Sequence, residues 1–425
     1  METLAASGYS AHLVGGCVRD SLMGRQPSDW DICTSALPEQ VIAAFPHHKV
    51  LPTGIGHGTV TVMMDGNPVE ITTLRRDGEY LDHRHPQTVE FTDSLKEDLA
   101  RRDFTVNAMA YAPQEGLTDP FGGADDLKAG LLRCVGNPRQ RFDEDALRIL
   151  RLLRFASQLS FQPESDTLAA AAELAPLLEK VSVERTAAEL NKLLLGEDVF
   201  HALCLAADHR IIEVIIPEFS PCMELQLDRR LFAAIAAAPP RLEIRLALLL
   251  HDIAKPQTLY QKGSGGCDDH AAVSAARAET ILKRLRYPNS VVKRVEMLVR
   301  QHMVPLPVHK AALRRLCAEW GADVVRDWIA FRRANSLATD QVHEAEQCDA
   351  AAKLLDEMLA AGMPLRVEDL AVGGKELLEM GVPPGPMVGQ ILRFLLEMVL
   401  EQPELNQKEI LLKEATLLWH RQSDS

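Results

Sequence analysis

The chain has 425 residues, of which 47% are apolar, and this length is enough for more than one hydrophobic core. Its formal net charge of −14 disfavours loose nucleic-acid binding over the whole surface, although local arginine clusters could still form a basic face. No apolar run reaches the roughly 20 residues of a membrane span, and the first residues lack a signal-peptide pattern, so a cytoplasmic location without a membrane partner is predicted.

Up to about Val135, short β-branched segments alternate with turn signals. LVGGCVRDSLMG predicts a strand, a glycine turn and a short helix that ends near Gly24. GTVTVMMDGNPVEITTLR predicts a hairpin that turns at Asp65-Gly66-Asn67. The polar stretch from Arg75 to Pro86 has little periodicity and is predicted to be a loop.

Helical periodicity dominates from Asp143 to the C-terminus, in Ala-, Leu- and Glu-rich stretches that prolines separate. No repeat of fixed period interrupts this pattern. The predicted fold class is therefore α+β, with a mixed β-sheet and helices in the N-terminal domain and an all-helical region after it.

Two aspartates, Asp29 and Asp31, lie one residue apart in SDWDICTS, which is otherwise typical of a buried strand. Alternate residues of a strand share a face, so the two carboxylates point the same way and repel each other. Glu70 lies between apolar neighbours in the predicted hairpin and also projects from a polar face. Convergent carboxylates are typical hard ligands of Mg²⁺, and a bound ion would offset the repulsion. Asp29 and Asp31 are the predicted metal ligands and, with Glu70, the predicted catalytic residues.

A candidate phosphate site precedes the aspartates. Gly15 and Gly16 allow the backbone to approach a phosphate, and Arg19 adds positive charge at the start of the predicted helix. A glycine pair before a helix is a weak signal alone. Followed by D-x-D, the pattern GG-x-V-R-D is far more specific.

LVGGCVRD followed by DWD resembles the class II nucleotidyltransferases related to polymerase beta, which include tRNA CCA-adding enzymes and bacterial poly(A) polymerases. RRDFTVNAMA, DPFGGADDL, EDALRILRLLRF and HDIAKP resemble further motifs of this family, in the same order. The resemblance covers most of the chain and is strongest up to Phe155. It implies a catalytic head at residues 1–137, a neck with a nucleotide-selecting motif at 138–200, an HD-like body at 201–350 and a tRNA-binding tail at 351–425.

Asp145 and Arg148 lie three residues apart in EDALRILRLLRF, the spacing of neighbours on one helix face. An aspartate can accept from the amino group of cytosine or adenine while an arginine donates to the adjacent ring nitrogen. Uracil and guanine present the opposite order and would leave both side chains mispaired. The pair is therefore predicted to select C and A without a template. An ordinary i,i+3 ion pair is the structural alternative.

The resemblance implies further residues of the nucleotide pocket. The implied nucleotide-binding set is Gly16, Arg19, Arg102, Asp145, Arg148, Arg151 and Arg154. Asp103 and Asn107 are implied to help hold the ribose and the local structure. A solvated arginine stripe is the alternative for the last two arginines.

HDIAKP resembles the metal-dependent HD phosphohydrolases, in which adjacent His and Asp residues ligate a metal with further His and Asp residues. The candidates are His251, Asp252, His270 and His302. However, MELQLDRRLF lacks the expected upstream histidine, and Asn335 stands where such a site usually supplies its last aspartate. A site that lacks two ligands should bind metal poorly, so we expect an HD-like helical fold that has lost hydrolysis.

The leading hypothesis is a tRNA nucleotidyltransferase that adds CCA to the tRNA 3′ end from CTP and ATP and releases pyrophosphate. A CC-adding relative is less favoured, because the resemblance implies a shortened loop there and RRDGEYLDHRHP is present here. Within the family, the chain could also be an A-adding enzyme or a bacterial poly(A) polymerase, the latter disfavoured by a C-terminus without a basic extension. Outside the transferases, it could be an HD-type phosphohydrolase or a catalytically inactive RNA-binding protein.

Overall fold

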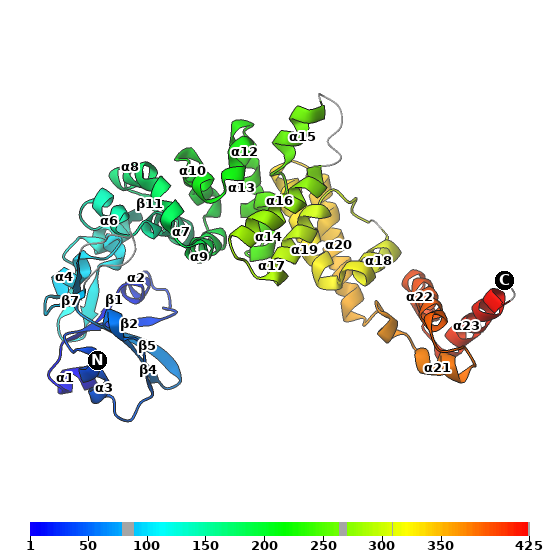
Figure 1. Ribbon diagram of the computed structural model, residues 1–425, viewed down its shortest axis with the longest axis horizontal. Coiled ribbons are helices and arrows are strands. Elements are labelled where there is room, and N and C mark those ends of the chain that lie inside the picture. Colours follow the sequence, from blue (N-terminus) through cyan, green and yellow to red (C-terminus); the bar gives the residue numbers. More distant parts are fainter. Residues whose placement is uncertain (79–88, 263–269, 308, 424–425) are drawn as a thin grey trace. The chain divides into compact units, whose positions relative to one another are not determined.

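The computed structural model of the chain describes residues 1–78, 89–262, 270–307 and 309–423 (Figure 1). The chain forms two compact units. The first comprises Met1–Met223 with Arg284–Arg286, and the second comprises Glu224–Lys283 with Tyr287–Ser425.

A seven-stranded mixed sheet lies in the first unit, with the strand order β3-β4-β5-β2-β1-β8-β9. Its strands are β1 (Ala11–Val14), β2 (Trp30–Thr34), β3 (Val50–Gly54), β4 (Thr59–Met64), β5 (Asn67–Thr73), β8 (Ala110–Ala112) and β9 (Gly116–Thr118). Neighbouring strands are antiparallel except β2 and β5, which are parallel. Strand β2 therefore has a partner on each side, and β4, β5, β2 and β1 are labelled side by side in Figure 1.

The predicted hairpin is confirmed as β4 and β5, which pair antiparallel. Asp65 and Gly66 at the turn have φ angles of 50° and 83°, so both adopt the left-handed conformation that tight hairpin turns require. Val60 and Val62 are fully buried on one face of β4, as the period of two predicts. The predicted loop is partly wrong, because Arg75–Asp77 forms β6 and pairs with β7 (Val89–Phe91). The rest of that prediction falls on residues 79–86, outside the described residues.

The predicted glycine turn is also confirmed, since it joins β1 to helix α2 (Gly16–Leu22). Gly15 has a φ of 78°, and a Cβ atom at this position would lie 2.7 Å from Nη1 of Arg102. Any larger residue would therefore combine backbone strain with displacement of an arginine from the cavity described below.

The other helices of the first unit surround this sheet or follow it in sequence. They are α1 (Glu2–Ala6), α3 (Pro38–Ala44), α4 (Leu95–Ala100), α5 (Gly123–Ala129), α6 (Pro138–Glu144), α7 (Leu147–Leu159), α8 (Ser165–Leu174), α9 (Val183–Leu194), α10 (Val199–Asp208) and α11 (Ile211–Ile215), with α12 (Ser220–Glu224) at its end. Helix α7 packs against α9 and α10 through apolar residues such as Ile149, Leu152 and Leu153, which are fully buried. Its arginines lie on the remaining faces, so α7 joins a buried core to a polar cavity.

Among its described residues, the second unit contains helices joined by turns and loops and no β-strand. It contains α13 (Asp228–Ala237), α14 (Leu242–Leu250), α15 (Lys255–Lys262), α16 (His270–Arg284), α17 (Asn289–Arg300), α18 (Lys310–Trp320), α19 (Ala322–Ala338), α20 (Val342–Ala360), α21 (Gly374–Glu379), α22 (Pro386–Glu401) and α23 (Lys408–Ser423). Helix α19 packs against α13, α14 and α20, and its Trp328 is fully buried. Within the described ranges, no helix combines the length and hydropathy of a membrane span. The predicted fold class, a mixed sheet followed by a mostly helical region, is confirmed.

Candidate functional site

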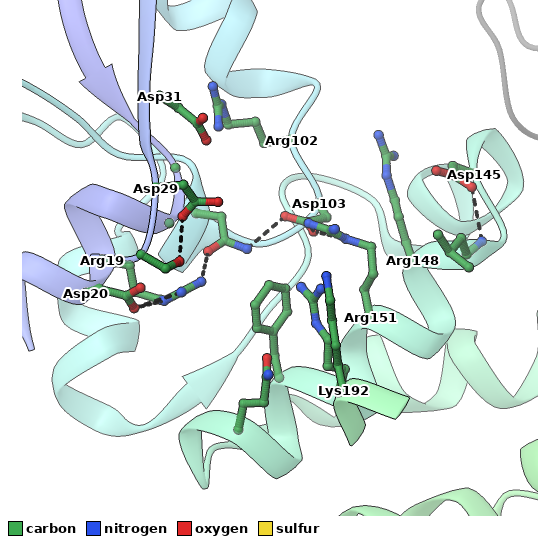
Figure 2. A pocket seen from close by; sticks show the side chains of 18 of the residues that line it. Arg19, Asp20, Asp29, Asp31, Arg102, Asp103, Asp145, Arg148, Arg151 and Lys192 are labelled. Atoms are coloured by element: carbon green, nitrogen blue, oxygen red, sulfur yellow. Dashed lines mark hydrogen bonds and ion pairs between the residues drawn. The ribbon is translucent and has the colours of Figure 1, made fainter. Parts of the chain in front are cut away.

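A cavity of about 600 Å³ lies in the first unit, next to the start of β2 (Figure 2). Residues of α2, β2, the segment after α4, α7 and α9 line it. The sequence-predicted residues that it brings together are Gly16, Arg19, Asp29, Asp31, Arg102, Asp103, Asn107, Asp145, Arg148, Arg151 and Arg154. Glu70 is not part of the lining.

The two aspartates both face this cavity, so the predicted convergence occurs. Asp31 lies in β2 directly opposite Glu70 of the parallel strand β5. Burial, together with the negative charges of Asp29 and Glu70, raises the pKa of Asp31 to about 6, and the positive charge of Arg102 opposes the shift. The fold therefore holds a partly buried carboxylate next to two others, a position that is unfavourable for its ionised form.

This donor set fits a divalent cation. Asp29 and Asp31 offer carboxylate oxygens, which are hard ligands, and Ser28 donates a hydrogen bond of 2.9 Å to one oxygen of Asp29. A cation between the two carboxylates would remove the repulsion that raises the pKa of Asp31.

A network of side-chain hydrogen bonds runs along one wall of the cavity (Figure 2). Arg19 donates to Asn107 (2.6 Å), Asn107 donates to Asp103 (3.1 Å), and Nε of Arg151 donates to the other oxygen of Asp103 (2.7 Å). Although burial alone would raise the pKa of Asp103, the Arg151 guanidinium holds that pKa well below its usual range. Asp103 and Asn107 therefore orient Arg19 and Arg151, which agrees with the predicted role in local structure.

Arg154 lies deeper, at 6% exposure. It pairs with Glu189 of α9 (3.2 Å), and its guanidinium carbon lies 4.0 Å from the centre of the Phe155 ring. Burial and the neighbouring Arg151 charge lower the pKa of Arg154 to about 10, so it still carries its charge at neutral pH.

The sequence prediction for Asp145 and Arg148 is wrong in one respect. The two residues do not share a helix, because α6 ends at Glu144, α7 begins at Leu147, and Asp145 between them has an extended backbone. Their side chains form no hydrogen bond or ion pair with each other, although the backbone N–H of Arg148 donates to the carbonyl of Asp145 (3.0 Å). Arg148 instead donates to Glu144 (2.9 Å) and to the backbone carbonyls of residues 101 and 141 (2.8 and 2.9 Å). Both still line the same cavity, and the ion-pair alternative is thereby excluded.

Helix α9 supplies two lining residues that the sequence analysis missed, Arg185 and Lys192. Arg185 donates to Oδ2 of Asp145 (3.1 Å), while the backbone N–H of Leu147 donates to Oδ1 (3.1 Å). The spacing of Arg185, Glu189 and Lys192 in VERTAAELNKLL is i, i+4, i+7, which places all three on one face of α9. This polar face, opposite the buried leucines of α9, was the feature of the sequence that could have indicated these two lining residues.

Comparison with known proteins identifies the family. Models for the poly(A) polymerase head domain, for the RNA and SrmB-binding site of polymerase A, and for tRNA nucleotidyltransferase domain 2 match residues 11–133, 160–223 and 269–415. The CCA-adding enzyme of Lactiplantibacillus plantarum is 36% identical and aligns with 98% of this chain and 95% of its own. The CCA-adding enzyme of Geobacillus kaustophilus is also 36% identical, and the alignment covers 96% of this chain and 93% of that enzyme.

The chain belongs to the CCA-adding enzyme family. The crystal structure of the Bacillus stearothermophilus CCA-adding enzyme in complex with CTP matches with a TM-score of 0.77 at 31% identity, and covers 100% of this chain and 97% of that chain. The Thermotoga maritima CCA-adding enzyme complexed with tRNA shares the fold, with a TM-score of 0.56 at 20% identity. The family and the enzyme class predicted from the motifs, a tRNA nucleotidyltransferase, are confirmed.

Nucleotidyltransferases of this family generally use a divalent metal, which agrees with the carboxylate pair in the cavity. The boundaries expected between head, neck, body and tail stay a prediction, as do the roles of the individual site residues. Residues 79–86 of the loop that was expected to distinguish CCA addition from CC addition lie outside the described residues.

The second unit brings the HD-like candidates together in a separate cavity of about 360 Å³. One ligand atom from each of Asp252, His270 and His302 lies within 4.8 Å of the other two, and all three side chains are buried. His251 lies beside them, with 3.8 Å between its Nε2 and Oδ2 of Asp252. The residues converge as an HD-like site requires, and Asn335 lines the same cavity.

We predict that Asp31→Asn stabilises the metal-free protein while it abolishes nucleotide transfer. Because the pKa of Asp31 is raised to about 6 in the folded chain, its ionisation favours the unfolded chain above that pH. The free energy of unfolding at pH 8 should rise by about 1–3 kcal/mol, and the gain should shrink to about half at pH 5.

Urea denaturation in EDTA at the two pH values measures this effect. Asp125→Asn is the matched control, because the Asp125 side chain is 89% exposed and should change stability little at either pH. A variant that is destabilised at pH 8, or equally stabilised at both pH values, would contradict the burial of a charged Asp31.

Proposed function

We propose that this enzyme adds C, C and A in succession to the 3′ end of tRNA, from CTP and ATP, with Mg²⁺ and release of pyrophosphate. One observation carries the proposal: two carboxylates, an arginine-lined wall and the Asp145–Arg148 pair face a single cavity. The relatives named CCA-adding enzymes, and the CTP bound to the one at 31% identity, support the same substrates.

The reaction joins the 3′ oxygen of the RNA to the α-phosphorus of the nucleotide, breaks the bond from that phosphorus to the bridging oxygen of the diphosphate, and releases the hydroxyl proton. We assign Asp29 and Asp31 to hold Mg²⁺, which when bound neutralises phosphate charge and makes the hydroxyl easier to deprotonate. Glu70, in register with Asp31 on β5, is the proposed third carboxylate or base.

The arginines are proposed to bind the triphosphate. Arg19 and Arg151 are fixed by Asn107 and Asp103, so they need little reorganisation when a phosphate arrives. Lys192 differs from them, because it forms no ion pair among the described residues of the chain. Its ammonium group can therefore serve the leaving diphosphate directly.

Asp145 and Arg148 are proposed to read the base. The contacts of Arg148 use three of its guanidinium N–H groups, which leaves two for a ligand. Each oxygen of Asp145 accepts one bond from the protein and retains a lone pair. The surroundings thus hold the two side chains in place and leave acceptor capacity on Asp145 and donor capacity on Arg148, the combination that cytosine and adenine match.

Incubation with tRNA that ends before CCA and with labelled CTP and ATP tests the function. The expected product gains C, C and A and then stops. Long A tails would indicate a poly(A) polymerase, and A addition only to tRNA that ends in CC would indicate an A-adding enzyme. Asp29→Ala should lower every incorporation by at least about 1,000-fold, because phosphate charge would lose its metal. Retained activity would refute the metal assignment.

Base selection is tested by Arg148→Ala. The ratio of CTP to UTP incorporation should fall about tenfold or more, because the donor that matches the ring nitrogen is lost. Arg185→Ala should lower the ratio less, by freeing Asp145, and Arg185→Lys should restore part of it.

Arg139→Ala is the control for this series, since Arg139 pairs with Glu173 on α8 and does not line the cavity. Affinity for tRNA should stay within about twofold of the wild type in the Arg148 variant. Unchanged nucleotide choice in Arg148→Ala would disprove the base-reading role.

Lys192→Met tests the diphosphate assignment. Loss of one charge-assisted hydrogen bond should raise KM for both CTP and ATP by about five- to tenfold. The KM for pyrophosphate in the reverse reaction should rise by a similar factor. Lys128→Met, a change at a 79% exposed lysine of α5, serves as the control. An effect on one nucleotide alone would point to a base contact and against this assignment.

A further inference from the structure

In the cavity around Asp252 in the second unit, the distances between potential ligand atoms suit a metal ion. The charges of the lining side chains do not. Asp252 accepts from Arg230 and from Lys255 (3.0 Å) through the same oxygen, and Nε2 of His270 lies 3.3 Å from its other oxygen. Burial alone would raise the pKa of Asp252, but its neighbours lower it below the usual range. Asp252 is therefore ionised, and two permanent cations already compensate its charge.

The formal charge of this cavity favours an anion. Its lining includes three cationic side chains, of Arg230, Lys255 and Arg332, and two carboxylates, of Asp252 and Glu344, which leaves an excess of one positive charge when the imidazoles are neutral. A divalent cation next to Asp252 would meet Arg230 and Lys255 at close range in a partly buried site. A phosphate monoester carries a charge of about −1.5 to −2 at neutral pH and would leave a smaller net charge in the cavity than a divalent cation would.

Hydrogen-bonding capacity for such a ligand remains. Lys255 uses one of its three N–H groups on Asp252 and keeps two for a ligand. The backbone carbonyls of Leu248 and Val299 accept from Nδ1 of His251 (2.8 Å) and of His302 (2.6 Å). The Nε2 atoms of these histidines are therefore acceptors, and that of His302 lies 3.1 Å from Nε2 of His270. Nε2 of His251 is the acceptor that remains for a hydroxyl group.

An apolar wall completes the cavity. Phe331 and Met303 line it together with the polar groups, and the Met303 side chain is 55% exposed. A volume of about 360 Å³ lies at the lower end of the range for small-molecule sites and is comparable to that of one nucleotide.

We propose that this cavity binds a nucleoside monophosphate without a metal ion, with the phosphate on Arg230 and Lys255, a ribose hydroxyl on His251 and the base against Phe331 and Met303. The site is independent of the transferase cavity in its residues, all of which lie in the second unit. Arg230 stands in MELQLDRRLF, the segment that lacks the expected histidine, so a cation of the chain takes the place of a metal ligand.

Equilibrium dialysis of the full-length protein with labelled 5′-AMP in EDTA tests the proposal. The Asp145→Ala, Arg148→Ala background removes the proposed base contacts of the transferase cavity, and one molecule of AMP should still bind per chain. Adding Lys255→Met should weaken that binding at least tenfold. Lys293→Met is the control, because Lys293 is an exposed lysine of α17 that does not line the cavity. On an otherwise wild-type chain, Lys255→Met should leave nucleotide transfer to tRNA unchanged, which shows that the chain still folds.

Binding of adenosine, of inorganic phosphate and of metal decides the ligand class. Adenosine should bind at least tenfold more weakly than AMP, and inorganic phosphate should compete more weakly than AMP. Equal affinity for inorganic phosphate and AMP would overturn the nucleotide assignment. One equivalent of tightly bound metal that is lost in His302→Ala, or AMP binding that requires added Mn²⁺ or Zn²⁺, would overturn the proposal as a whole.

Discussion

The repulsion between carboxylates at the start of β2 is the constraint on which the transferase cavity depends. Asp31 lies between partner strands on both sides, with Glu70 in register on β5 and Asp29 two residues before it. Its raised pKa measures how unfavourable this position is for a charge in the absence of a cation. A fold selected for stability alone would gain from an amide here, so the carboxylate is best explained by the cation that it can hold.

The arginines opposite these carboxylates show how the same cavity manages positive charge. Arg151 forms an ion pair with Asp103, and Arg154 forms one with Glu189. These partners come from segments that are distant in sequence, so they fix the relative position of the segment after α4, α7 and α9. Ion pairs of this kind contribute little net stability once desolvation is counted, but they hold guanidinium groups ready for a phosphate.

The sequence predicted those features that depend on local chemistry. The hairpin at Asp65-Gly66 and the turn at Gly15 follow from turn residues, and the buried face of β4 follows from the period of two. Both aspartates line one cavity, but Asp29 precedes β2, which begins at Trp30, so strand alternation does not account for its position. The contacts of Asp145 could not be predicted in the same way, because its partner Arg185 is 40 residues away and the break between α6 and α7 removes the helical spacing. Tertiary contacts determine the position of Asp145. Helical periodicity alone predicted one helix for both residues, whereas Arg148 lies in α7 and Asp145 lies before it.

The two cavities described above, around Asp31 and around Asp252, carry acidic groups with opposite charge balance. In the first, Asp31 has two acidic neighbours and one opposing arginine, so a cation improves the local electrostatics. In the second, Asp252 is already compensated by Arg230 and Lys255, and His270 lies within hydrogen-bond reach of both Asp252 and His302. Among the described residues, three or more potential ligand atoms lie within 4.8 Å of one another only in the second cavity. Local charge balance therefore distinguishes the proposed metal site from the proposed anion site. A search that only counts converging His and Asp residues would instead favour the cavity around Asp252 as the metal site.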